Sequence, residues 1–126
     1  MACFTDFFPT AAELAGTGAP ADLDGLSLVP ALLGRLREQR WHRFLYWEFH
    51  ERGFSQAVLM EGRWKAVRNR RPDLPLELYD LEVDPGETRE VAADHPQVLA
   101  LIEEYLRTAR SDSPDWPIRF ARLKKY

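Results

Sequence analysis

The pattern of apolar and polar residues changes twice along the chain. Up to about residue 42, short apolar clusters are interrupted by Gly and Pro, which predicts two short helices, one ending at Gly16 and one over residues 28–33. Thr5 and Ser27 are the expected N-caps, and Gly34 the second stop. Helices this short are not stable alone, so their apolar faces need a partner.

From Arg43 onward, apolar residues recur with a period of two, which is typical of strands. Four strands are expected, over residues 43–49, 55–60, 64–69 and 76–81. Glu61-Gly62-Arg63 predicts a hairpin between the second and third, and Asp84-Pro85-Gly86 predicts a turn after the fourth. Strands joined by such short loops favour an antiparallel sheet.

The last regular element is a long helix, predicted by an apolar stripe at spacings of three and four. Asp94 is the expected N-cap, with Pro96 in the first turn. The stripe consists of Val98, Ile102, Tyr105, Leu106 and Ala109. We therefore predict an α+β fold with two short helices in residues 1–42, a four-stranded antiparallel sheet covered by the long helix in residues 43–112, and an irregular tail over residues 113–126.

Charge and composition narrow the possible functions. The 126 residues carry a net charge of −3, but residues 35–71 are basic and residues 73–104 are acidic. A basic segment either pairs with the acidic half or attracts a sulfated or phosphorylated polymer. No apolar run approaches the ~20 residues of a membrane span, and no basic aromatic RNA-binding motif is present, so neither membrane nor nucleic acid is an expected partner.

Several short motifs occur together in order: Gly62-Arg63-Trp64-Lys65, Leu78-Tyr79-Asp80-Leu81 and Asp84-Pro85-Gly86-Glu87, preceded by Asp6-Phe7-Phe8-Pro9-Thr10 and by Asp24-Gly25-Leu26-Ser27-Leu28. Each motif alone is common, but this order and spacing resemble the C-terminal region of the type I sulfatases, the arylsulfatase-like hydrolases. One departure is Glu90-Val91-Ala92, where many relatives carry Asn. Trp64 is expected in the core, Lys65 as a solvated or paired charge, and Asp80 as a hydrogen-bond acceptor.

The resemblance implies chemistry that this chain does not contain. Type I sulfatases use a formylglycine made from Cys or Ser in a Cys/Ser-x-Pro/Ala-x-Arg motif, with a divalent cation, usually calcium, held by Asp and Asn. Here Cys3, the only cysteine, is followed by Phe4-Thr5-Asp6-Phe7, which does not match the motif. We therefore expect no catalytic residue, no metal ligand and no cofactor within this chain, and no sulfatase activity from it alone.

Glu48, His50 and Arg52 are the candidates for substrate contact. They alternate at the end of the first strand, and facing outward together they would reach a substrate bound to the parent catalytic domain. The alternative is an exposed loop with ordinary charge pairing. A metal site built from His50 with Glu48 or Glu51 is a weaker interpretation.

Three hypotheses follow for the whole chain. The first is a non-catalytic C-terminal subdomain of a sulfatase, which lacks the N-terminal catalytic domain and shapes the substrate cleft of the intact enzyme. The second is a stand-alone interaction or sulfated-glycan-binding module that uses residues 63–71, and the third is a truncated reading frame without function. Exposed apolar residues of the short helices, such as Phe7, Phe8 and Leu14, predict a homodimer when the catalytic domain is missing.

Overall fold

The chain forms two compact units, which meet in the sequence at Arg43 and Phe44. The computed structural model describes residues 1–50, 53–115 and 117. The first unit contains a 3-10 turn, η1 (Phe4–Asp6), and two short helices, α1 (Phe7–Leu14) and α2 (Val29–Leu32). The second contains an antiparallel sheet in the order β1-β2-β3-β4 and helix α3 (Pro96–Leu106).

The sheet of the second unit follows the predicted pattern closely. Its strands are β1 (Phe44–Phe49), β2 (Ser55–Met60), β3 (Trp64–Arg68) and β4 (Glu77–Asp80). Between β2 and β3, Glu61 and Gly62 both adopt positive φ angles, 54° and 73°. The Arg63 N–H closes this turn by donating to the Met60 carbonyl at 3.1 Å. Such a turn matches the twist of the flanking strands, as the Gly62 signal predicts.

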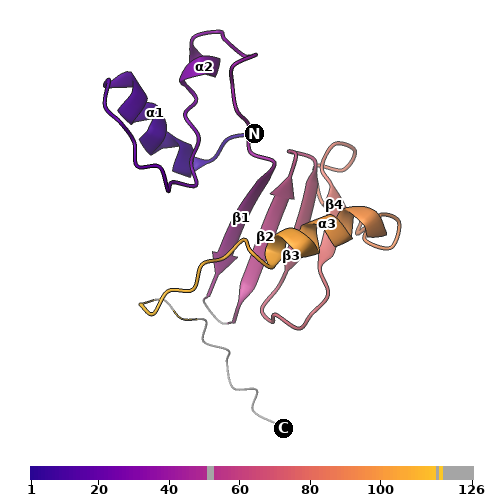
Figure 1. Ribbon diagram of the computed structural model, residues 1–126. Coiled ribbons are helices and arrows are strands. Elements are labelled where there is room, and N and C mark those ends of the chain that lie inside the picture. Colours follow the sequence, from indigo (N-terminus) through magenta and orange to yellow (C-terminus); the bar gives the residue numbers. More distant parts are fainter. Residues whose placement is uncertain (51–52, 116, 118–126) are drawn as a thin grey trace. The chain divides into compact units, whose positions relative to one another are not determined.

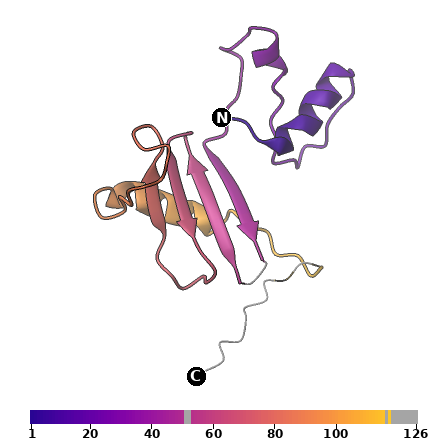
Figure 2. The ribbon, with the colours of Figure 1, turned by 180° about the vertical axis from the view of Figure 1, so that it is seen from behind.

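Helix α3 lies across one face of the sheet, and among the described residues of the second unit no helix lies over the other face (Figures 1 and 2). The core forms between this helix and the sheet, where Leu78 and Ile102 are fully buried. Burying one such side chain stabilises the fold by about 1.5–3 kcal/mol. The remaining buried members of the core are Val58, Met60, Ala66 and Leu76. The α+β class, the antiparallel sheet and the covering helix are therefore confirmed.

The covering helix differs from the prediction in its length and its cap. It has 11 residues and ends at Leu106, so it is not long, and Ala109 lies beyond it. His95 occupies the N-cap position, and no side chain caps the helix. The Asp94 carboxylate instead accepts a bond from Arg89 at 2.8 Å. The predicted Asp94 cap is wrong because His95 separates that side chain from the first turn.

The N-terminal cap is also displaced. Thr5 lies inside η1 and does not cap it, because the turn begins two residues earlier than expected, with Cys3 at its N-cap. The Cys3 N–H donates to the Asp6 carboxylate at 2.8 Å. Ser27 does contribute to the next helix, since its hydroxyl accepts the Val29 N–H at 3.2 Å.

Two of the family motifs have the structural roles expected from the sequence. Trp64 packs against the core, while Lys65 pairs with both oxygens of Glu87 at 2.6 Å. Asp80 accepts a two-pronged bond from Arg63 at 2.9 and 2.6 Å, as well as the Glu82 N–H. These hydrogen bonds from Arg63 hold the pKa of Asp80 below its ordinary value, so Asp80 is a charged structural acceptor.

Candidate functional site

The predicted substrate-contact residues lie at the end of β1. Glu48 is on the face that α3 covers, because it alternates with Trp47 and Phe49, and His50 follows the strand. Arg52 lies outside the described residues. Glu48 and His50 come together, but they are largely buried, with side chains 23% and 15% exposed.

Glu48 is the centre of a polar cluster, which we call the Glu48 cluster and define as Tyr46, Glu48, His50 and Arg110. The carboxylate accepts the Tyr46 hydroxyl at 2.8 Å, a His50 ring nitrogen at 3.0 Å and the Arg110 Nε at 3.1 Å. Sequence reasoning missed Arg110, which is 62 residues away from Glu48 and gives no local signal. The cluster thus fastens the segment after α3 to the first strand of the sheet.

The electrostatics of this cluster make Glu48 an acceptor and not a base. Burial disfavours the charged carboxylate, but the hydrogen bonds from Tyr46 and His50 and the charge of Arg110 outweigh it and lower the pKa of Glu48. Burial and the neighbouring carboxylate raise the pKa of the Tyr46 hydroxyl, which remains a donor. A general base near neutral pH needs a higher pKa than an anchored carboxylate has.

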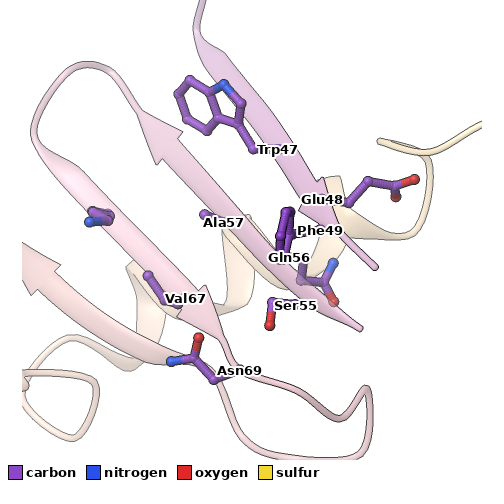
Figure 3. A pocket seen from close by; sticks show the side chains of 9 residues that line it. Trp47, Glu48, Phe49, Ser55, Gln56, Ala57, Val67 and Asn69 are labelled. Atoms are coloured by element: carbon purple, nitrogen blue, oxygen red, sulfur yellow. The ribbon is translucent and has the colours of Figure 1, made fainter. Parts of the chain in front are cut away.

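The opposite face of the sheet carries a shallow trough of about 430 Å³. Trp47 and Phe49 of β1 form one wall, and Ala57 of β2 lies in the floor (Figure 3). The Glu48 carboxylate is directed away from the Trp47 ring (Figure 3). The other lining residues are Ser55, Gln56, Lys65, Val67 and Asn69.

In the first unit, a buried carboxylate gathers three donors. Asp6 is fully buried and accepts the N–H groups of Cys3 and Leu26, each at 2.8 Å, and a ring nitrogen of His42 at 2.7 Å. Burial alone would raise the pKa of Asp6, but these bonds, led by the Leu26 N–H, lower it. Gly25 permits this approach, because a Cβ there would lie 2.1 Å from the Thr5 carbonyl oxygen.

The calcium and formylglycine of the sulfatase family do not fit the residues that the structure describes. Among the described residues, one group has three potential metal ligands close together: Cys3, Asp6 and His42. Calcium requires six to eight oxygen ligands, whereas this group offers one carboxylate already engaged by three donors. The Cys3 thiol contacts the Thr5 hydroxyl at 2.8 Å and lacks the formylglycine motif, so no catalytic step is derived from it.

Part of the basic segment is paired with acidic neighbours. Arg63 pairs with Asp80 and Glu82, Lys65 with Glu87, and Arg71 with Asp73. Internal pairing therefore accounts for these three cations, whereas Arg68 bonds the neutral Gln56 amide. In the part of the chain that the structure describes, no helix is long and apolar enough to cross a membrane.

The chain was compared with known families and proteins. Residues 1–112 match the family model described as N-sulphoglucosamine sulphohydrolase, C-terminal. The chain is 32% identical over 120 residues to a Delta 4,5-hexuronate-2-O-sulfatase of Bacteroides thetaiotaomicron, covering 85% of this chain and 24% of that protein. It is 31% identical over 112 residues to bovine (Bos taurus) Arylsulfatase K, covering 82% of this chain and 21% of that protein.

A solved structure shares the fold as well as the sequence pattern. The chain matches a 2-O GAG sulfatase with a TM-score of 0.71 and 27% identity, covering 92% of this chain and 27% of that one. The chain thus spans about a quarter of the length of the proteins it matches. The motif order, the sheet with its covering helix and the match over nearly the whole chain agree, and the chain belongs to the sulfatase C-terminal family.

Proposed function

We propose that this chain is a non-catalytic C-terminal subdomain of a sulfatase that hydrolyses sulfate esters, and that it shapes the substrate cleft of the intact enzyme. The family match over residues 1–112 carries this proposal. Its own carboxylates support it, since Asp6, Glu48 and Asp80 are each engaged by several donors with lowered pKa values. Groups fixed in this way build a scaffold, and the sulfate ester is cleaved by residues outside this chain.

The first unit is the surface on which a catalytic domain would pack. Phe4, Phe7 and Phe8 are 90%, 68% and 55% exposed, and the rings of Phe4 and Phe7 stack with centroids 6.1 Å apart. Apolar groups exposed this fully and gathered on η1 and the start of α1 are typical of an interaction surface. The relatives are about four times longer than this chain, so their remaining residues are the proposed cover.

Without that cover, the same surface predicts a homodimer of the isolated chain. Size-exclusion chromatography with light scattering measures the mass, and Phe4→Ser combined with Phe7→Ser is expected to return a dimer to the monomer. A monomeric wild-type chain at high concentration would contradict the homodimer while leaving the subdomain proposal intact.

The connection after β1 is the proposed substrate contact, through Glu48, His50 and Arg52. Glu48 holds the His50 ring by its hydrogen bond, and the edge of Phe54 packs against that ring at 5.4 Å. A histidine fixed on two sides loses little entropy when it binds a substrate. Glu48 is thus a positioning residue, while His50 and Arg52 are the groups offered to the substrate.

The test uses the full-length polypeptide that carries this sequence. An in-frame Cys/Ser-x-Pro/Ala-x-Arg motif in the DNA upstream of Met1, and sulfate release by that polypeptide but not by the present chain, are the expected results. Sulfate release by the present chain alone would overturn the non-catalytic role. Hydrolysis by neither polypeptide would overturn the sulfatase assignment itself.

Substrate contact is tested by kinetics on the full-length polypeptide. His50→Ala and Glu48→Gln are expected to raise KM for a sulfated oligosaccharide more than they lower kcat, because they act on binding. Glu103→Gln, an exposed substitution on α3, is the matched control. Equal KM values in all of these variants would remove the contact proposal.

The stand-alone glycan-binding alternative rests on residues 63–71. Arg63, Lys65 and Arg71 pair with acidic neighbours, which weakens this alternative because neutralised charges attract a polyanion less. Strongly salt-dependent binding of the isolated chain to heparin would favour that alternative.

A further inference from the structure

The face of the sheet opposite α3 has a shape set by the strand register. Across the sheet, Trp47 lies opposite Ala57, which in turn lies opposite Val67, and Phe49 lies opposite Ser55. Large side chains on β1 thus stand beside small ones on β2. The result is a trough that follows β2, with its floor at Ser55 and Ala57.

Two aromatic side chains form the β1 wall of this trough. Trp47 and Phe49 are 46% and 57% exposed, and they point to the same face because they are two residues apart on one strand. The outer face of an antiparallel sheet is usually polar. Two adjacent exposed aromatic groups in a concave surface are therefore a sign of a ligand.

Each charged side chain among the described lining residues of the trough is paired with an opposite charge. The Lys65 ammonium is held by both oxygens of Glu87, and the Glu48 carboxylate is bound to Arg110. What remains at the trough are uncharged groups, the amide of Asn69 and the Ser55 hydroxyl, whose oxygen already accepts the Arg70 N–H at 2.9 Å and whose O–H is left as a donor. The trough is thus complementary to a neutral ligand with apolar faces and hydroxyl edges.

We propose that this trough binds the sugar rings of a linear saccharide, through stacking on Trp47 and Phe49 and hydrogen bonds to Ser55 and Asn69. A sugar ring presents C–H groups on its faces and hydroxyls at its edges, which match the two kinds of lining group. The volume of about 430 Å³ lies within the roughly 300–1,000 Å³ usual for ligand sites. A peptide fits less well, because peptides added to sheets bind the backbone of an edge strand and not the side chains of a face.

This inference deepens the proposed function and rests on it for the choice of a saccharide. It places a second contact with the substrate polymer on the face of the sheet opposite the Glu48 cluster. The contact recognises the rings and not the sulfate groups, because the one ammonium among the described lining residues is already paired. A holding site of this kind retains the polymer independently of where its sulfate groups are.

The test compares a heparin-derived hexasaccharide with its chemically desulfated counterpart, by calorimetric titration of the isolated chain. Both are expected to bind with affinities within about threefold, and with little change between roughly 50 and 300 mM salt, because stacking is not screened. Trp47→Ala is expected to weaken both by about tenfold or more, as the loss of one stacking aromatic does. Trp47→Tyr is expected to restore most of the binding.

Trp41→Ala is the matched control, since Trp41 is 49% exposed and belongs to the first unit. Far-UV circular dichroism of Trp47→Ala verifies that the fold is kept, which is expected for an exposed side chain. Any of three results would overturn the inference: no binding of either saccharide, equal losses in Trp41→Ala and Trp47→Ala, or salt-sensitive binding of the sulfated saccharide alone. Protection of Trp47 from a soluble quencher in the full-length polypeptide would also overturn it, because the trough would then be covered.

Failure of this inference and failure of the proposed function give different results. Hydrolysis of a small aryl sulfate by the wild-type full-length polypeptide reports on the sulfatase alone and needs no trough. Saccharide binding by the isolated chain reports on the trough alone and needs no catalysis.

Discussion

Each of the two units of this chain is stabilised by a different kind of interaction. The second unit has an apolar core, in which Leu78 and Ile102 are fully buried between the sheet and α3. The first unit buries Val29 and Pro9, but its other buried side chains are polar, Asp6 and Gln39. Its large apolar side chains, by contrast, are mostly exposed.

Polar side chains in the first unit replace the missing core by binding the backbone. The segment before and within α2 donates one N–H after another to side chains: Leu26 to Asp6, Leu28 to Thr10, and Ala31 to Gln39. Hydrogen bonds are directional and fix a shape, but each adds only about 1 kcal/mol net. The first unit therefore has a defined shape with little stability of its own, as expected for a surface that is completed by another domain.

The largest test of this difference between the units is to remove a core side chain from the second unit. Leu78→Ala is expected to lower the free energy of unfolding by about 2–5 kcal/mol, through lost burial and a residual cavity. Denaturant unfolding monitored by circular dichroism measures it. Val83→Ala is the control, since Val83 is 76% exposed and should change stability by less than about 0.5 kcal/mol. Equal losses in the two variants would show that the core is not where the stability resides.

The corresponding change in the first unit is Asp6→Asn. The new amide presents donors where Asp6 accepted the N–H of Cys3 or Leu26, so a buried donor loses its partner at a cost of about 1–3 kcal/mol. Amide hydrogen exchange at Leu26 is expected to accelerate, while exchange at Val58 in the second unit is unchanged. Asp22→Asn, at an exposed position, should alter neither. Equal acceleration at Val58 would mean that the two units open together.

The same contrast explains which features could be predicted from the sequence. Sheet, hairpin and helix face were predictable because period-two and period-3.6 patterns report burial directly, and Gly62 reports the turn. The hydrogen bonds from His42 to Asp6 and from Arg110 to Glu48 span 36 and 62 residues. Such bonds depend on the tertiary position of both residues and leave no local pattern in the sequence. The pairing of Glu48 with Arg110 could therefore not be predicted. The Asp94 cap failed because His95 occupies the N-cap position, and the Asp94 carboxylate pairs with Arg89 instead.

The pH dependence of the free energy of unfolding tests the role of the Glu48 cluster. Because the pKa of Glu48 is lowered in the folded chain, its contribution is complete above the unfolded value of about 4.3 and is lost as the pH falls through the folded pKa. We expect wild type to lose more of its free energy of unfolding than Glu48→Gln as the pH falls below about 4.3, because the variant has no carboxylate to protonate at this position. Denaturant unfolding at a series of pH values measures the difference. Parallel curves for the two proteins would show that Glu48 is not anchored as described.

The smallest expected effect concerns the start of α3, where the core helix depends on burial more than on a cap. Asp94 pairs with Arg89, and both side chains are more than half exposed. Because exposed ion pairs contribute little, Asp94→Ala is expected to change the free energy of unfolding by less than about 0.5 kcal/mol, and Arg89→Ala by a similar amount. An N-cap residue would instead cost about 1 kcal/mol or more on its own, with no matching effect at position 89. The pair of variants separates the two roles, because only a surface ion pair makes their effects both small and non-additive in the double variant.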